Sequence, residues 1–201
     1  MRQPSAAADP CGISAARLTL PSTNGAVIAR EVVFPVLATG LIVTYADVRV
    51  PLGLPGHRGL IWLTLLVAVA LVTHRAQTVV AVGAACTIAT VMVGGATNPW
   101  TDSRYLAAAI LLYAVTEVAT RRGRRWLIAP AAAPIHLVAL AAPVVALIER
   151  GRLSAVVSTG MVEKMVYHLV FGLIAGLLAW ALALGIEHSA SAHLPSGESR
   201  R

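Results

Sequence analysis

Residues 164–186, KMVYHLVFGLIAGLLAWALALGI, decide the fold class of this protein. After Lys164 this stretch contains no Asp, Glu, Lys or Arg. A helix needs about 20 apolar residues to cross the hydrocarbon core of a bilayer, and this run is long enough. The stretch therefore predicts a transmembrane helix.

The composition of the whole chain supports this interpretation. Of the 201 residues, 57% are hydrophobic and only 12% are charged, whereas a soluble domain has roughly 25% charged residues. The mean hydropathy is +0.75. A soluble fold of this size has too much surface to cover with so few charges. We therefore expect an all-α membrane protein in which lipid surrounds the apolar side chains.

Five more apolar stretches lie earlier in the chain, and together with residues 164–186 they predict a bundle of six transmembrane helices. They cover residues 30–48, 60–73, 76–94, 104–120 and 126–148. The second is short for a bilayer crossing, and the fifth contains Pro130, Pro134 and Pro143, which predict an irregular backbone. We expect the six-helix domain to span residues 26–187, between disordered cytoplasmic tails at 1–25 and 188–201.

The arginines predict the orientation of the bundle. The densest charge cluster is Arg121, Arg122, Arg124 and Arg125, between the fourth and fifth apolar stretches. Lys and Arg close to span ends are retained on the cytoplasmic side. Both termini are then cytoplasmic, and we expect a multi-pass protein of the inner (plasma) membrane. A five-span alternative that rejects the short second stretch would place the two termini on opposite sides.

Polar and aromatic residues from three distant segments gather on the predicted outer side. Such a mixture of rings, imidazoles and charges suits a pocket for a small polar ligand. The alternative is an interfacial aromatic belt with helix-capping charges. The candidate ligand-binding residues are His57, Arg58, Asn98, Trp100, Asp102, Arg104, Tyr105, Lys164, Tyr167 and His168.

Ionisable groups inside a span are costly, and three of those in the predicted spans are candidates for a specific role. His168 follows Lys164 by four residues, so the two share a helix face; His168 lines a cavity or binds a backbone carbonyl. His136, between two prolines, is expected to bond a carbonyl that proline leaves unpaired. Glu117 has the spacing for a salt bridge with Arg121, or it relays protons.

Small residues at helical spacing mark candidate surfaces for docking a partner helix. Gly172 and Gly176 form a GxxxG pattern, and Gly25, Ala29 and Gly40 lie in or near the first span. The alternative is ordinary packing inside the bundle.

Catalytic and metal-binding patterns are missing from the sequence. It contains no HExxH, GxSxG or Walker motif, and Cys11 and Cys86 are too far apart for a thiolate metal site. We expect no enzymatic activity, no cofactor and no nucleic-acid partner. Because the chain has no nucleotide site, a partner must supply energy for any active transport.

The six-span layout resembles the S component, the substrate-binding subunit of energy-coupling factor (ECF) transporters, over roughly residues 30–187. The loop Leu54-Pro55-Gly56-His57-Arg58-Gly59 is similar to the first loop of that family, as is the stretch HLVFGLIAGLL at residues 168–178. Metal-specific members begin with Met-His, whereas residue two here is Arg2, which disfavours cobalt or nickel.

The resemblance implies a mechanism and partners. An S component binds a vitamin or a metal ion from outside, with its first loop as a lid. It docks on a transmembrane coupling subunit, and two cytoplasmic ATPases drive the release of the substrate inside. The sequence thus predicts a subunit that binds a small polar, vitamin-like solute; the alternative is a membrane scaffold or assembly subunit without a ligand.

Overall fold

The computed structural model of this protein describes residues 23–46, 56–94, 102–151 and 159–192. All regular structure in these residues is helical, which confirms the predicted all-α class. Three helical stretches are long and apolar enough to cross a membrane: Gly25–Ala46, Arg125–Glu149 and Gly160–Ser189. These helices indicate a membrane protein.

The first helical stretch consists of α1 (Thr23–Ile28), a π-helical turn (Ala29–Val33) and α2 (Phe34–Ala46). The π-helical turn ends just before Pro35, which lacks an N–H and whose ring would crowd the carbonyl of the residue four positions earlier. Widening of the helix at this point relieves that conflict. The helix begins at Thr23, so residues 23–25 of the predicted N-terminal tail are helical. Residues 1–22 lie outside the described part.

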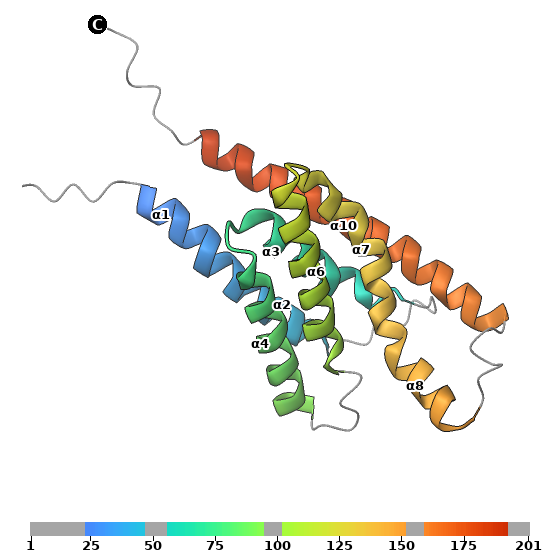
Figure 1. The fold of residues 1–201 in the computed structure, drawn as a ribbon. Helices are drawn as coiled ribbons and strands as arrows, with labels where there is room; N and C mark the ends of the chain where they lie inside the picture. The colour runs from blue at the N-terminus through green and yellow to red at the C-terminus, as the bar shows by residue number, and fades with distance from the viewer. Residues whose placement is uncertain (1–22, 47–55, 95–101, 152–158, 193–201) are drawn as a thin grey trace, which may run out of the picture.

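The short second stretch is a helix too short to cross the hydrocarbon core of a bilayer by itself. Helix α3 (Gly59–Val72) has 14 residues, or about 21 Å at 1.5 Å per residue, whereas the hydrocarbon core is about 30 Å thick. Most of its residues are buried, and it lies in the middle of the bundle (Figure 1). Only residues 73–76 separate it from α4 (Gln77–Gly94), which confirms the predicted tight hairpin.

The remaining helices follow the predicted order. They are α6 (Arg104–Arg121), a 3-10 turn (Arg125–Leu127), α7 (Ile128–His136), a second 3-10 turn (Leu137–Leu140), α8 (Ala141–Glu149) and α10 (Thr159–Ala192). The break between α7 and α8 confirms the irregular backbone expected from the prolines. Helix α10 continues beyond residue 187, so residues 188–192 are helical and do not belong to a disordered tail.

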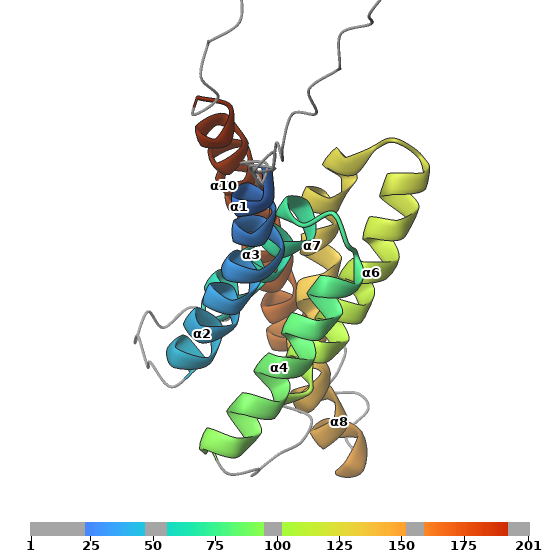
Figure 2. The same cartoon turned by 90° about the vertical axis from the view of Figure 1, so that its left-hand side faces the viewer.

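Neighbouring helical stretches run in opposite directions and form one bundle (Figures 1 and 2). Helix α10 packs mainly on α7 and α3, and α4 packs on α6 and α2. The start of α1 and the end of α10 lie at the same end, where Arg30 meets Glu187 at 3.7 Å. We call this end, which also holds Arg121–Arg125, the arginine end, and the opposite end, with Arg58 and Arg104, the pocket end.

The two glycines of the GxxxG pattern in α10 pack against another helix of the same chain. A Cβ atom at Gly172 would lie 2.7 Å from the carbonyl oxygen of Ala132, and one at Gly176 would overlap the carbonyl oxygen of Ala129. Both glycines are buried against α7, so a partner helix cannot reach them. The predicted docking role of Gly172 and Gly176 is therefore wrong, because the close approach they permit is to α7.

Candidate functional site

A small polar pocket opens at the pocket end, where α2, α3 and α6 meet. Its volume is about 50 Å³. Three aromatic rings, two guanidinium groups and two aliphatic side chains surround it. The residues that line it are Ile42, Tyr45, Ala46, Arg58, Trp62, Arg104 and Tyr105. The sequence analysis selected Arg58, Arg104 and Tyr105 from two separate segments, and the fold brings them to one place.

The two arginines give the pocket a positive charge. The Arg104 guanidinium donates a hydrogen bond of 2.7 Å to the Tyr105 hydroxyl, and its central carbon lies 4.8 Å from the centroid of that ring. Its Nε is buried and has no partner within the described residues. Neither Arg58 nor Arg104 forms an ion pair with a residue that the structure describes. Unpaired guanidinium groups suit a carboxylate or a phosphate, which they bind through charge-assisted hydrogen bonds.

A row of aromatic rings leads from the pocket into the core. Trp62 packs edge-on against Tyr105, with ring centroids 5.4 Å apart, and against His136 at 5.9 Å. The rings of His136 and His168 follow at 4.6 Å. All four side chains are buried. Trp62 thus connects the pocket to the two histidines in the interior.

His136 joins three helices. Its Nδ1 lies 2.8 Å from the backbone oxygen of His168, and since a carbonyl only accepts, Nδ1 carries the proton. The other nitrogen, Nε2, faces Gly59 at the start of α3, where a Cβ atom would overlap it. The expectation that His136 bonds a carbonyl is confirmed. That carbonyl belongs to α10 and is not one freed by a proline of its own span.

Two glycines allow the start of α3 to lie close to these imidazoles. Gly56 has a φ of 87°, a conformation that residues with a Cβ atom rarely adopt. A Cβ atom there would lie 3.3 Å from the ring of His168, and Gly59 leaves room for His136. The turn over residues 56–59 therefore covers the histidine pair directly.

The other predicted ligand-binding residues are more scattered. His57, Asp102 and Tyr167 are half-buried and do not line the pocket. Lys164 is exposed while His168 is buried, so these two do not form a shared site. Asn98 and Trp100 lie outside the described residues. The sequence analysis missed Tyr45 and Trp62; the position of Trp62, four residues after Arg58 on a helix, was a signal that could have found it.

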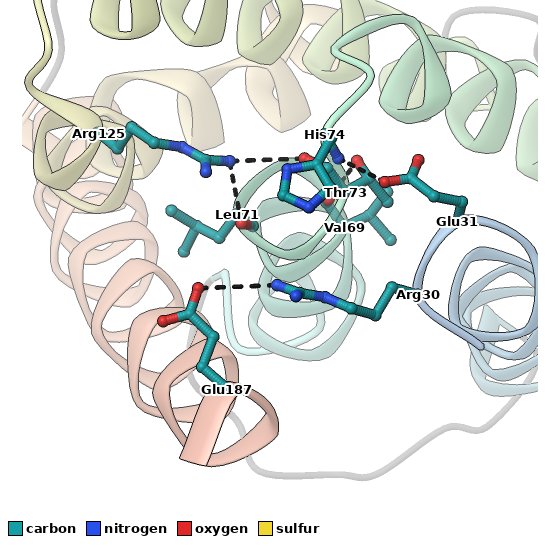
Figure 3. A network of polar contacts seen from close by, with 8 residues as sticks. All are labelled: Arg30, Glu31, Val69, Leu71, Thr73, His74, Arg125 and Glu187. Atoms are coloured by element: carbon teal, nitrogen blue, oxygen red, sulfur yellow. Dashed lines mark hydrogen bonds and ion pairs between the residues drawn. The ribbon is translucent and has the colours of Figure 1, made fainter. Parts of the chain in front are cut away.

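A second polar network, at the arginine end, explains how α3 can be so short (Figure 3). The Arg125 guanidinium donates hydrogen bonds to the backbone oxygens of Leu71 at 3.1 Å and Thr73 at 3.5 Å. The last carbonyls of a helix lack partners of their own, and unpaired ones are costly in lipid. Arg125 supplies these partners, and its positive charge suits the negative end of the helix dipole.

The helix before Pro35 contributes to the same network (Figure 3). Glu31 Oε1 accepts a 2.7 Å hydrogen bond from the backbone N–H of His74, and Arg30 pairs with Glu187 of α10. The π-helical turn thus presents two adjacent charges to α3 and α10. The predicted salt bridge of Glu117 is also confirmed, because Arg121 lies 3.4 Å from it.

Arg125→Gln is expected to lower the free energy of unfolding by about 1–3 kcal/mol, because charge-assisted hydrogen bonds to the end of α3 are lost. Thermal unfolding in detergent measures this change. Arg122→Gln is the matched control, because Arg122 directly follows α6 in the same arginine cluster, its side chain is exposed, and it forms no ion pair within the described residues. Equal effects of the two substitutions would show that Arg125 does not support α3.

No protein family model, curated protein or solved structure matches this chain. Function is therefore inferred from the two polar sites themselves. The network at the arginine end satisfies backbone groups of α3, which is a structural task. The pocket has unpaired positive charge and aromatic rings in its lining, and it is the candidate ligand site.

Proposed function

We propose that this protein is the substrate-binding membrane subunit of an ECF-type importer for a small anionic, vitamin-like solute. The observation that carries the proposal is the pocket at which Arg58 and Arg104 meet the rings of Tyr45, Trp62 and Tyr105. The guanidinium groups would hold a carboxylate or a phosphate, and the rings would contact the rest of the solute.

The proposed topology has six spans in the inner membrane and both termini in the cytoplasm. Its support is the antiparallel order of the helical stretches (Figure 2) and the gathering of Arg30 and Arg121–Arg125 at one end. With the arginine end in the cytoplasm, the pocket faces the exterior. A reporter fused after Arg125 is expected to be inaccessible from outside, and an accessible one would contradict an import role.

The proposed partners are a transmembrane coupling subunit and cytoplasmic ATPases, since the chain has no nucleotide-binding motif. Gly25, Ala29 and Gly40 remain candidates for docking on the coupling subunit. All three are exposed, and added Cβ atoms at the two glycines would meet nothing within 4 Å. A close helix contact from outside is therefore sterically possible along α1 and α2.

Arg104→Gln is expected to weaken solute binding by about tenfold to a hundredfold, since a charge-assisted hydrogen bond contributes about 1.5–3 kcal/mol. Mass spectrometry of small molecules that co-purify with the protein identifies the solute, and titration then gives the affinity of each variant. Arg150→Gln is the control, because Arg150 is an exposed arginine that does not line the pocket. Unchanged affinity in Arg104→Gln would exclude this pocket as the binding site.

One observation favours the alternative of a membrane scaffold. The pocket volume of about 50 Å³ is well below the roughly 300–1,000 Å³ typical of small-molecule sites. A scaffold would purify without a bound solute, and Arg104→Gln would leave its assembly with partners unchanged. An ECF subunit would instead co-purify with ATPases and carry a solute that Arg104→Gln releases.

A further inference from the structure

A second concave surface lies at the arginine end, far from the pocket. It is an open groove of about 270 Å³ between the last turns of α6 and the 3-10 turn that follows. Its lining is entirely aliphatic. The lining residues are Ala114, Val115, Val118, Ala119 and Leu127. An apolar groove of this kind on a membrane helix suits an acyl chain.

The turn that ends α6 places two arginines beside this groove. The backbone N–H of Arg122 donates to the carbonyl of Val118 at 3.1 Å, and that of Arg124 to the carbonyl of Ala119 at 2.8 Å. Gly123, with a φ of 64°, allows the chain to reverse between them. Both arginines are thus tied through their backbones to residues that line the groove.

Of the four arginines in this cluster, two are already engaged with other residues of the protein. Arg121 pairs with Glu117, and Arg125 binds the end of α3. Arg122 and Arg124 are exposed and form no ion pair with a residue in the described part of the chain. An apolar groove therefore ends at a pair of available positive charges.

Trp126 indicates the depth of the groove in the membrane. Its side chain is 57% exposed, although it lies directly beside Leu127 of the groove. Exposed tryptophans are typical of the level of the lipid headgroups, where the ring is partly in hydrocarbon and its N–H is in contact with water. The arginines next to it would then be level with lipid phosphates.

We propose that the groove and the neighbouring Arg122 and Arg124 together form a binding site for an anionic phospholipid. One acyl chain lies in the groove along α6, and the headgroup phosphate accepts hydrogen bonds from Arg122 and Arg124. Only a ligand with an anionic head and an apolar tail matches both parts of the surface. If the arginines served orientation alone, they would attract the anionic leaflet in general and the groove would be dispensable.

The test uses the full-length protein, purified in detergent and mixed with equal amounts of phosphatidylglycerol and phosphatidylcholine that carry identical acyl chains. Native mass spectrometry then counts the retained lipids. Preferential retention of phosphatidylglycerol is expected. Each arginine near an anionic headgroup contributes a factor of about five in affinity, so Arg122→Gln with Arg124→Gln should reduce the preference by about twenty-five-fold. Arg150→Gln, at the pocket end, should leave the preference intact.

A groove-filling substitution tests the apolar part. Val118 is 48% exposed, so Val118→Trp can fold and should reduce retention of both lipids by occupying the groove. Equal retention of the two lipids by the unmodified protein would overturn the proposal. So would a preference that survives the double arginine substitution, or full displacement of the lipid by glycerol phosphate, which has no acyl chain.

Discussion

Gly59→Ala is expected to be among the most destabilising single substitutions in this protein, with a loss of about 3 kcal/mol or more. The added Cβ atom would overlap Nε2 of His136, a side chain with no exposed surface. The imidazole can move away only by giving up its hydrogen bond to the backbone of His168. Thermal unfolding in detergent, followed by tryptophan fluorescence, measures the loss.

A double-mutant cycle identifies the cause. His136→Ala alone costs stability because it leaves a cavity and removes a hydrogen bond, but it also makes room for the methyl group. In that background Gly59→Ala should cost about 2 kcal/mol less than in the unmodified chain. Gly40→Ala is the control, because nothing lies within 4 Å of a Cβ atom there. The same loss in both backgrounds would show that His136 is not the obstacle.

Gly176→Ala is expected to separate α7 from α10, with a loss of about 2–4 kcal/mol in the free energy of unfolding. Its Cβ atom would overlap the carbonyl oxygen of Ala129 and lie 2.8 Å from the carbonyl carbon. Backbone atoms cannot avoid the contact by changing rotamer, so the helices themselves must shift. Thermal unfolding and solute binding are both measured, because the shift reaches the pocket through His136 and Trp62.

The control for this substitution lies on the same helix. A Cβ atom at Gly185 would meet nothing within 4 Å, and alanine favours the helix over glycine by about 1 kcal/mol. Gly185→Ala should therefore be neutral or slightly stabilising. If Gly176→Ala behaved in the same way, the close contact between α7 and α10 would have to be absent in the membrane.

The two substitutions act on one structural unit. Helices α3, α7 and α10 meet at His136, which faces Gly59 of α3 and donates a hydrogen bond to the backbone oxygen of His168 in α10. Arg125, on the same helical stretch as His136, binds the other end of α3. The short helix is thus held at both ends by one neighbour, and its first turn carries Trp62 of the pocket.

Local features of the sequence determined the helices themselves. The apolar runs, the tight hairpin after α3 and the irregular stretch around Pro134 and Pro143 all follow from residues close together in the chain. Hydrophobicity, proline geometry and charge at span ends act over a few residues, so they can be interpreted without knowing the neighbours. The same holds for Glu117 and Arg121, which are one helical turn apart.

Tertiary structure alone decided which faces are used and which residues meet. The GxxxG pattern of Gly172 and Gly176 indicated a close helix contact, but only the fold shows that α7 fills it. In the same way, Arg58 and Arg104 become a pocket only because α3 and α6 start at the same end. The physical reason is that packing depends on the shapes of two surfaces at once, whereas a sequence pattern describes one surface at a time.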